Sequence, residues 1–272
     1  MSKTTKKLKE IWEYRETRKV LEDSDFMITI TSNLLTNLSN RSNFIHKELI
    51  SYKEKDRNVD VNLQLLTGLY VCSLVTCWET FFRDLVIFIC NHDKDIHDRI
   101  VSEHVGDIPL GLTIGEFYVR KYNFQNLEQI RQAFDDIFQK STIELSEYFA
   151  QDVFTGVVFF EYSVLLIWLH DGNFKEAIDE VLQSAFRIRH RVTHDANYLV
   201  DFDPSLLSKI ESVFQIVPQL FTSKMAEKYS QKRFVFNTKE RYVRIAEAPR
   251  EYELHYAFSA KDFMANDYII VE

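Results

Sequence analysis

A cluster of basic and titratable side chains ends one segment of this otherwise acidic chain, the run GNFKEAIDEVLQSAFRIRHRVTHDANYL over residues 172–199. The members of the cluster are Arg187, Arg189, His190, Arg191 and His194. Histidine exchanges protons near neutral pH and can act as a general base or a general acid. Arginine stays charged and offers a planar fork of donors that fits phosphate oxygens. These residue types suit metal-free cleavage of RNA, in which a 2'-hydroxyl loses its proton and negative charge grows on the phosphorane.

Helical geometry sets a condition on that chemistry. At about 100° per residue, Arg189 and His194 stand about 140° apart around a straight helix and do not face one phosphate. In one arrangement that would unite them, the helix breaks near Thr193 to Asn197, where Asp195 and Asn197 favour a cap or turn, and His194 swings round. In another, two chains pair so that two copies of the cluster face each other across a cleft.

The spacing from Arg189 to His194, with the polar His190 after the arginine, resembles the R-x4-6-H signature of the HEPN superfamily, the higher eukaryote and prokaryote nucleotide-binding domains. A second run, SLVTCWETFFRDLV at residues 73–86, is similar to the Trp-Glu-x-Phe helix of several HEPN groups. The resemblance implies a multi-helix HEPN-like bundle that acts on RNA as a homodimer with a composite site. It also implies a metal-independent endoribonuclease without a cofactor, in antiviral defence or as a toxin.

The resemblance and the chemistry together suggest a role for each member of the cluster. We expect His194 to act as general base or acid, Arg189 to stabilise the transition state, and His190 to help with orientation. Arg187 and Arg191 are candidates for contacts with the RNA backbone. An antitoxin or another defence-system protein is a candidate partner.

The second run adds two candidate supporting residues, Glu79 and Arg83. Their i, i+4 spacing is also that of an ordinary ion pair on a helix whose Trp78 lies at the edge of the core. HEPN toxins that are silenced by nucleotidylation carry the modified tyrosine two residues after the histidine. That position is Ala196 here, and the nearest tyrosine is Tyr198, so control by this route is not expected.

Two other interpretations of the cluster stay open. The chain can be a catalytically inactive HEPN-like module for dimerisation, nucleotide sensing or partner binding. Alternatively, the cations only neutralise the negative end of a helix dipole in a structural adaptor.

Composition favours a mainly α fold, since the 272 residues include 46% hydrophobic and 14% aromatic residues but only 6 Gly and 4 Pro. A formal net charge of -8 argues against a broad basic face that coats nucleic acid, but it permits a focused basic cleft. The apolar periodicity predicts helices over residues 3–23, 27–49, 60–90, 126–139, 153–169, 172–199 and 203–229. Of these, residues 60–90 carry the strongest core pattern of the N-terminal half.

The periodicity changes to an alternating pattern after Lys232. We therefore expect a helical domain over residues 1–230 and a small β-containing appendage over residues 231–272. A unit of that size rarely supports its own core, so it should dock on the helical body or on another subunit.

The cysteines and the apolar segments indicate a cytoplasmic protein that does not contact a membrane. The three cysteines lack a C-x-x-C spacing and are expected to be reduced core thiols: Cys72, Cys77 and Cys90. Residues 1–9 are basic but lead into a charged run, unlike a secretory signal. Residues 153–169 contain Glu161 and are expected to form a buried central helix instead of a membrane span.

The histidines that follow the strongest core segment do not predict a metal site. His97 follows His92 by five residues and His104 follows His97 by seven, so the three histidines do not share one helical face. We expect them to be solvated loop residues.

Overall fold

The computed structural model describes residues 25–51, 61–124, 127–139, 168, 171–237 and 242–246, and these residues are mainly α-helical. The helices are α2 (Phe26–Ser51), α3 (Val61–His92), α4 (Lys94–Glu103), α5 (Ile114–Tyr118), the 3-10 helix η2 (Val119–Lys121), α6 (Leu127–Phe138), α9 (Phe174–His194) and α10 (Pro204–Lys228). The helices expected over residues 3–23 and 153–169 lie outside the described residues.

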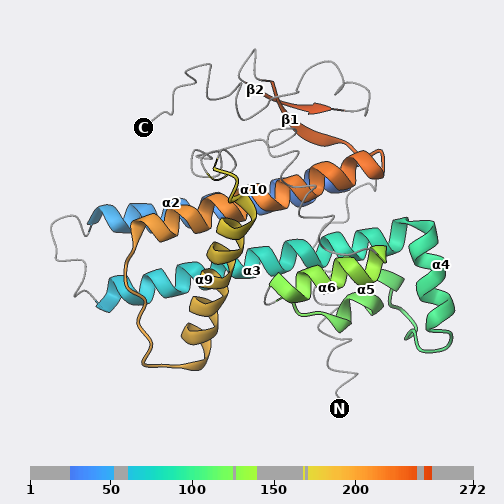
Figure 1. The fold of residues 1–272 in the computed structure, drawn as a ribbon, viewed down its shortest axis with the longest axis horizontal. Helices are drawn as coiled ribbons and strands as arrows, with labels where there is room; N and C mark the ends of the chain where they lie inside the picture. Colours follow the sequence, from blue (N-terminus) through green and yellow to red (C-terminus); the bar gives the residue numbers. More distant parts are fainter. Residues whose placement is uncertain are drawn as a thin grey trace.

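Helix α3 is the central element of the bundle. It contacts α2, α4, α5, α6, α9 and α10, and Figure 1 shows α9 crossing it steeply while α2 and α10 run along it. Buried residues extend along α3 from Leu63 near its start to Cys90 near its end, whereas Val61, Leu65 and Leu69 on one face are exposed. The core role expected for residues 60–90 is confirmed.

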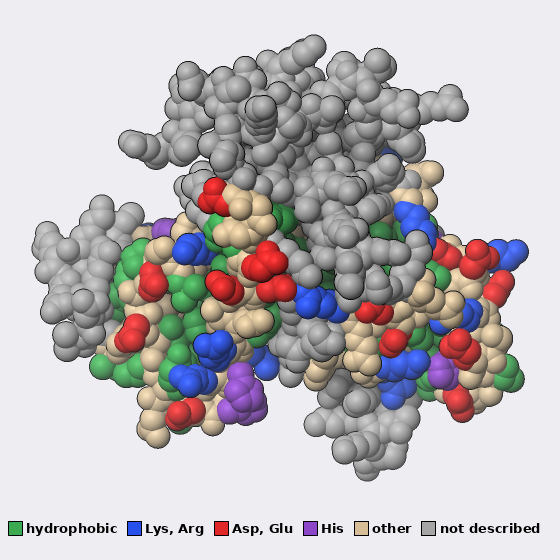
Figure 2. Space-filling model, in the orientation of Figure 1, with side chains coloured by type: hydrophobic (Ala, Val, Ile, Leu, Met, Phe, Trp, Pro, Cys, Tyr) green, Lys and Arg blue, Asp and Glu red, His purple; other side chains and the backbone are tan. Residues whose placement is uncertain are grey.

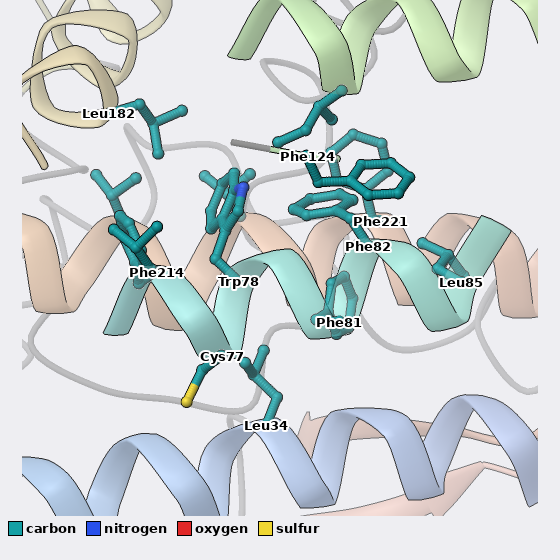
Figure 3. Close-up of a cluster of buried hydrophobic side chains, with 14 of the residues drawn as sticks. Leu34, Cys77, Trp78, Phe81, Phe82, Leu85, Phe124, Leu182, Phe214 and Phe221 are labelled. Carbon is teal, nitrogen blue, oxygen red and sulfur yellow. The ribbon is translucent and has the colours of Figure 1, made fainter. Parts of the chain in front are cut away.

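Aromatic side chains from α3 and α10 meet at the middle of α3 (Figure 3). The Trp78 ring lies 4.8 Å from both Phe82 and Phe214, and Phe82 lies 5.0 Å from Phe221. The expected place of Trp78 at the core edge is wrong, because only 1% of this residue is exposed. Its Nε1 has no hydrogen-bond partner among the described residues, so the apolar contacts of the ring hold it there.

Helix α3 is also long and apolar enough, by length and composition, to cross a membrane. More than half of its most apolar window, 56%, is buried inside the protein. Core helices of this kind pass the same test, because they too are apolar on most sides.

Two contacts set the position of α9 against the rest of the bundle. At the C-terminal half of α9, a Cβ on Gly68 of α3 would lie 3.0 Å from Cγ2 of Val192, so the glycine permits a closer approach than an ordinary carbon contact. Nearer its start, Nη2 of Arg131 in α6 donates to both carboxylate oxygens of Asp179, at 2.9 and 2.6 Å. The second contact is a charge-assisted pair in which one guanidinium nitrogen bridges both carboxylate oxygens, and it limits rotation of α9 about its axis.

The segment that follows α3 is more helical than expected. His92 is the last residue of α3, His97 lies inside α4, and His104 is the C-cap of α4. Asp93 caps the start of α4, since its side chain accepts a hydrogen bond from the Ile96 amide. The expectation of loop histidines was wrong because a side-chain cap starts a short helix whose apolar face is too brief to produce a clear period.

The last helix and the strands follow local signals. Pro204 is the first residue of α10, and the Asp203 carboxylate accepts hydrogen bonds from the amides of Ser205 and Leu206. Beyond α10, β1 (Arg233–Asn237) pairs antiparallel with β2 (Tyr242–Ala246), and β1 contacts α10 and α2. The appendage over residues 231–272 as a separate unit stays a prediction.

Candidate functional site

The whole basic cluster lies on one uninterrupted helix. Helix α9 continues through His194, and its cap is Asp195, whose amide donates to the Arg191 carbonyl. The Thr193 hydroxyl donates to the carbonyls of Arg189 and His190, at 2.8 and 3.0 Å, within the last turns. The expected cap is present at Asp195, whose Oδ1 accepts from the Asn197 amide. Because α9 is still helical at His194, this end does not turn His194 towards Arg189, and the first of the two arrangements is wrong.

Four members of the cluster share one face of α9, which we call the basic face: Arg187, His190, Arg191 and His194. On an α-helix these positions fall within a sector of about 100°. All four residues are exposed. Figure 2 shows histidine side chains beside Lys and Arg side chains at the lower left, over the end of α9. Two imidazoles and two guanidiniums are thus open to a ligand on one surface.

The two imidazoles of the basic face are neighbours. The ring centroids of His190 and His194 lie 4.7 Å apart, and their planes are inclined by 51°. The Arg191 guanidinium lies 5.2 Å from the centre of the Tyr198 ring, a cation–π contact with the chain that follows the helix. One chain therefore supplies two groups that can each carry a proton, where the sequence assigned His190 only to orientation.

Arg189 faces α3 and not the basic face. Its side chain is 23% exposed, and its Nη2 lies 3.7 Å from Oε1 of Glu79, whose side chain is 13% exposed. This is an ion pair at a separation longer than a hydrogen bond. The same Glu79 oxygen has no hydrogen-bond partner within the described ranges. The structure thus brings Arg189 and Glu79 together and holds the guanidinium apart from His194.

The environment of Glu79 works against its charge. Burial raises the pKa of the Glu79 carboxyl, and the charges of Arg189 and Arg83 offset only part of that rise. Arg83 therefore acts on Glu79 through its charge, from the next turn of α3. The two candidate supporting residues and Arg189 form one electrostatic group at the crossing of α3 and α9.

An exposed apolar row on α3 adjoins this group, and we call it the α3 stripe. Its members are Val61, Leu65 and Leu69, which are 51%, 47% and 63% exposed. Their i, i+4, i+8 spacing puts them on one face with Cys72. Burial raises the pKa of the Cys72 thiol, and the charge of the nearby Arg189 counteracts that rise. The stripe therefore extends along α3 from a position beside Arg189.

Sequence reasoning missed a polar network on the other side of α3. The Tyr70 hydroxyl and the Ser42 hydroxyl both donate to Oε1 of Glu211, the latter at 3.1 Å, and His46 Nε2 lies 3.5 Å from the same oxygen. Burial, with Glu211, raises the pKa of Tyr70 above its usual range. The network joins α2, α3 and α10. Its only signal in the sequence is a glutamate within the apolar pattern of α10, which does not identify its partners.

Among the residues that the structure describes, no group of three or more His, Cys, Asp or Glu side chains is arranged to hold a metal ion. Cys72, Cys77 and Cys90 are free thiols, with Cys77 and Cys90 buried. No family model matches the sequence, and neither the curated proteins nor the solved structures contain a significant match.

Proposed function

We propose that this protein is a metal-independent endoribonuclease of HEPN type that acts as a homodimer. The observation that carries the proposal is the basic face of α9, where the ring centroids of His190 and His194 lie 4.7 Å apart on the same face as two exposed arginines of an acidic protein. This arrangement supplies both proton-transfer groups and phosphate-binding charge without a metal ion.

In the proposed reaction, His194 accepts the proton of an RNA 2'-hydroxyl. The 2'-oxygen attacks the adjacent phosphorus, and the bond from phosphorus to the 5'-oxygen breaks. A second imidazole, from His190 or from the other chain, donates a proton to the departing 5'-oxygen. The products are a 2',3'-cyclic phosphate and a 5'-hydroxyl, and an arginine stabilises the charge on the phosphorane. Arg187 and Arg191 bind neighbouring phosphates.

The dimer follows from the direction of Arg189. In one chain this side chain faces α3, about 140° around α9 from His194, and α9 remains helical between them. A second chain bound on the α3 stripe would lie next to Arg189, so its own basic face could complete the site there. Exposed Leu65 and Leu69 support such an interface, because apolar rows of this kind commonly mark protein contacts.

Cleavage of a single-stranded RNA in EDTA tests the proposal. We expect wild type to release 2',3'-cyclic phosphate ends, and His194→Ala to lose most of the activity, since a positioned acid or base contributes about 10²- to 10⁴-fold. His97→Ala is the matched control, because it removes a histidine of α4 outside the cluster. Equal cleavage by wild type and His194→Ala would show that the assignment is wrong.

Two arginine variants separate the composite site from a site within one chain. In a composite site, Arg189→Ala should lower kcat, whereas Arg191→Ala should mainly raise KM. If Arg191→Ala lowers kcat and Arg189→Ala has no effect, the basic face of a single chain is sufficient and the composite site is refuted.

The second candidate function is a catalytically inactive HEPN-like module for dimerisation, nucleotide sensing or partner binding. The ion pair between Arg189 and Glu79 favours it, because this guanidinium already has an anionic partner. Absence of RNA cleavage by a folded dimer would support this alternative. Under either proposal the protein works in the cytoplasm, without a membrane, and an antitoxin or another antiviral defence protein is its proposed partner.

A further inference from the structure

His190 and His194 are placed as a bidentate chelate. They occupy i and i+4 positions on α9, both are exposed, and their ring centroids are 4.7 Å apart. Paired imidazoles at this helical spacing are the ligand arrangement of many zinc sites, because positions four apart face the same direction.

The separation of the rings fits one shared ion. A zinc ion lies about 2.0–2.1 Å from a ligating imidazole nitrogen, and hence about 3.2 Å from the centre of that ring. Two such rings with an angle of about 90–110° at the metal have centroids about 4.5–5.2 Å apart. The observed 4.7 Å lies inside that interval. Rotation about the broad χ2 torsion of histidine can then aim a nitrogen of each ring at the ion.

The surroundings permit a cation but provide no complete cage. Asp195 follows His194 directly, and Arg191 lies over the Tyr198 ring. Repulsion from the arginines of the exposed basic face is reduced by solvent and salt. The described residues include no third His, Cys, Asp or Glu side chain grouped with this pair. Water or a ligand from a second molecule must therefore fill the remaining coordination positions of the ion. Imidazole ligands and an open coordination sphere suit borderline divalent ions such as Zn²⁺ and not Mg²⁺.

We propose that His190 and His194 together bind one divalent transition-metal ion, with Zn²⁺ as the representative, and that the bound ion inhibits the protein. The binding site stands on the geometry alone. The inhibition rests on the proposed function: an imidazole nitrogen that ligates a metal cannot accept the proton of a 2'-hydroxyl, so metal removal restores RNA cleavage.

Calorimetric titration of the full-length protein with Zn²⁺ at pH 7.5 tests the site without any activity. We expect one site per chain, and we expect His190→Ala and His194→Ala each to weaken binding at least about tenfold, because even the groups behind metal ligands change affinity by about 10- to 100-fold. His97→Ala keeps the pair and should bind as wild type does. Circular dichroism of each variant confirms that α9 and the other helices remain folded.

Loss of the site in one variant but not in the other overturns the chelate, since both imidazoles are required. Undetectable Zn²⁺ binding by wild type, or equal loss in His97→Ala, also overturns it. RNA cleavage with and without EDTA then separates the two proposals. If wild type binds Zn²⁺ but does not cleave RNA even in EDTA, the endoribonuclease proposal is refuted and the metal-site proposal still holds. If the protein cleaves RNA equally well with Zn²⁺ bound at His190 and His194, the proposed inhibition is refuted.

Discussion

Replacing Gly68 by alanine tests whether the close approach of α3 and α9 positions the basic cluster. The new Cβ would lie 3.0 Å from Cγ2 of Val192 and 3.2 Å from Cγ2 of Val200. Ordinary contacts between carbon atoms are about 3.5–4.0 Å, so the neighbours must move by several tenths of an ångström. Val192 lies in a helix, where valine strongly prefers one rotamer, and it cannot rotate away easily.

Two opposing terms set the size of the effect. Overpacking a close contact costs about 1–3 kcal/mol, whereas alanine is about 0.8–1.0 kcal/mol better than glycine inside a helix. The free energy of unfolding of Gly68→Ala should therefore fall by about 0–2 kcal/mol. Combining it with Val192→Ala removes the shorter of the two contacts and leaves the one to Val200, so the cost of the Gly68 change should shrink by about 1 kcal/mol, within the scale of coupling between touching residues.

The assay is urea unfolding, followed by circular dichroism, of wild type, the two single variants and the double variant. Gly68→Ala should also lower RNA cleavage, because it displaces α9. Positive coupling, together with recovery of RNA cleavage in the double variant, would show that this contact positions α9. Additivity within about 0.5 kcal/mol would refute the reasoning, because residues that do not touch behave in that way.

Three further predictions concern charge and assembly. Asp93 caps α4; burial raises the pKa of its carboxyl, but donors from Ile96, Tyr229 and Lys228 outweigh this, so the net pKa is below its usual value. The Asp93 carboxylate therefore stabilises the fold at pH values above the pKa that it has in the unfolded chain. This contribution is lost as the pH falls through the lower pKa that it has in the folded protein. Asp93→Asn should lower the free energy of unfolding by about 1–3 kcal/mol at pH 7 and much less in acid, as measured by urea unfolding at both pH values; an equal loss in acid would contradict the account. Burial raises the pKa of Glu79, so its charged form disfavours folding once pH exceeds the unfolded pKa. Glu79→Gln should then not lower the free energy of unfolding at pH 7, although it should reduce RNA cleavage; reduced stability with unchanged cleavage would assign Glu79 a purely structural role. Leu69→Lys should convert a dimer to a monomer in light scattering, whereas Phe44→Lys, which alters an exposed side chain of α2, should leave the dimer intact; a dimeric Leu69→Lys variant would exclude the α3 stripe as the interface.

The helices with a long apolar period could be predicted from the sequence. Helix α6 lies within the predicted residues 126–139, and α10 begins at Pro204 after its Asp203 cap. In these segments local hydrogen bonding and the 3.6-residue period agree, so neighbouring residues are enough to identify the element. The short helices α4 and α5 could not be found in this way, because their starts depend on the capping side chains of Asp93 and Thr113 and their apolar faces are brief.

The sequence by itself determined which groups are available for chemistry and the angle between them. Arg189, His190 and His194 belong to one helix, and the helical period alone puts the two histidines on one side and Arg189 on another. The local residue types also predicted a cap at Asp195, where α9 ends, whereas only the tertiary structure decided which side of α9 is covered. The close approach of Val192 to Gly68 turns Arg189 towards Glu79 and leaves the two imidazoles in solvent. That orientation depends on shape complementarity between residues far apart in the chain, and no local pattern of residue types encodes it.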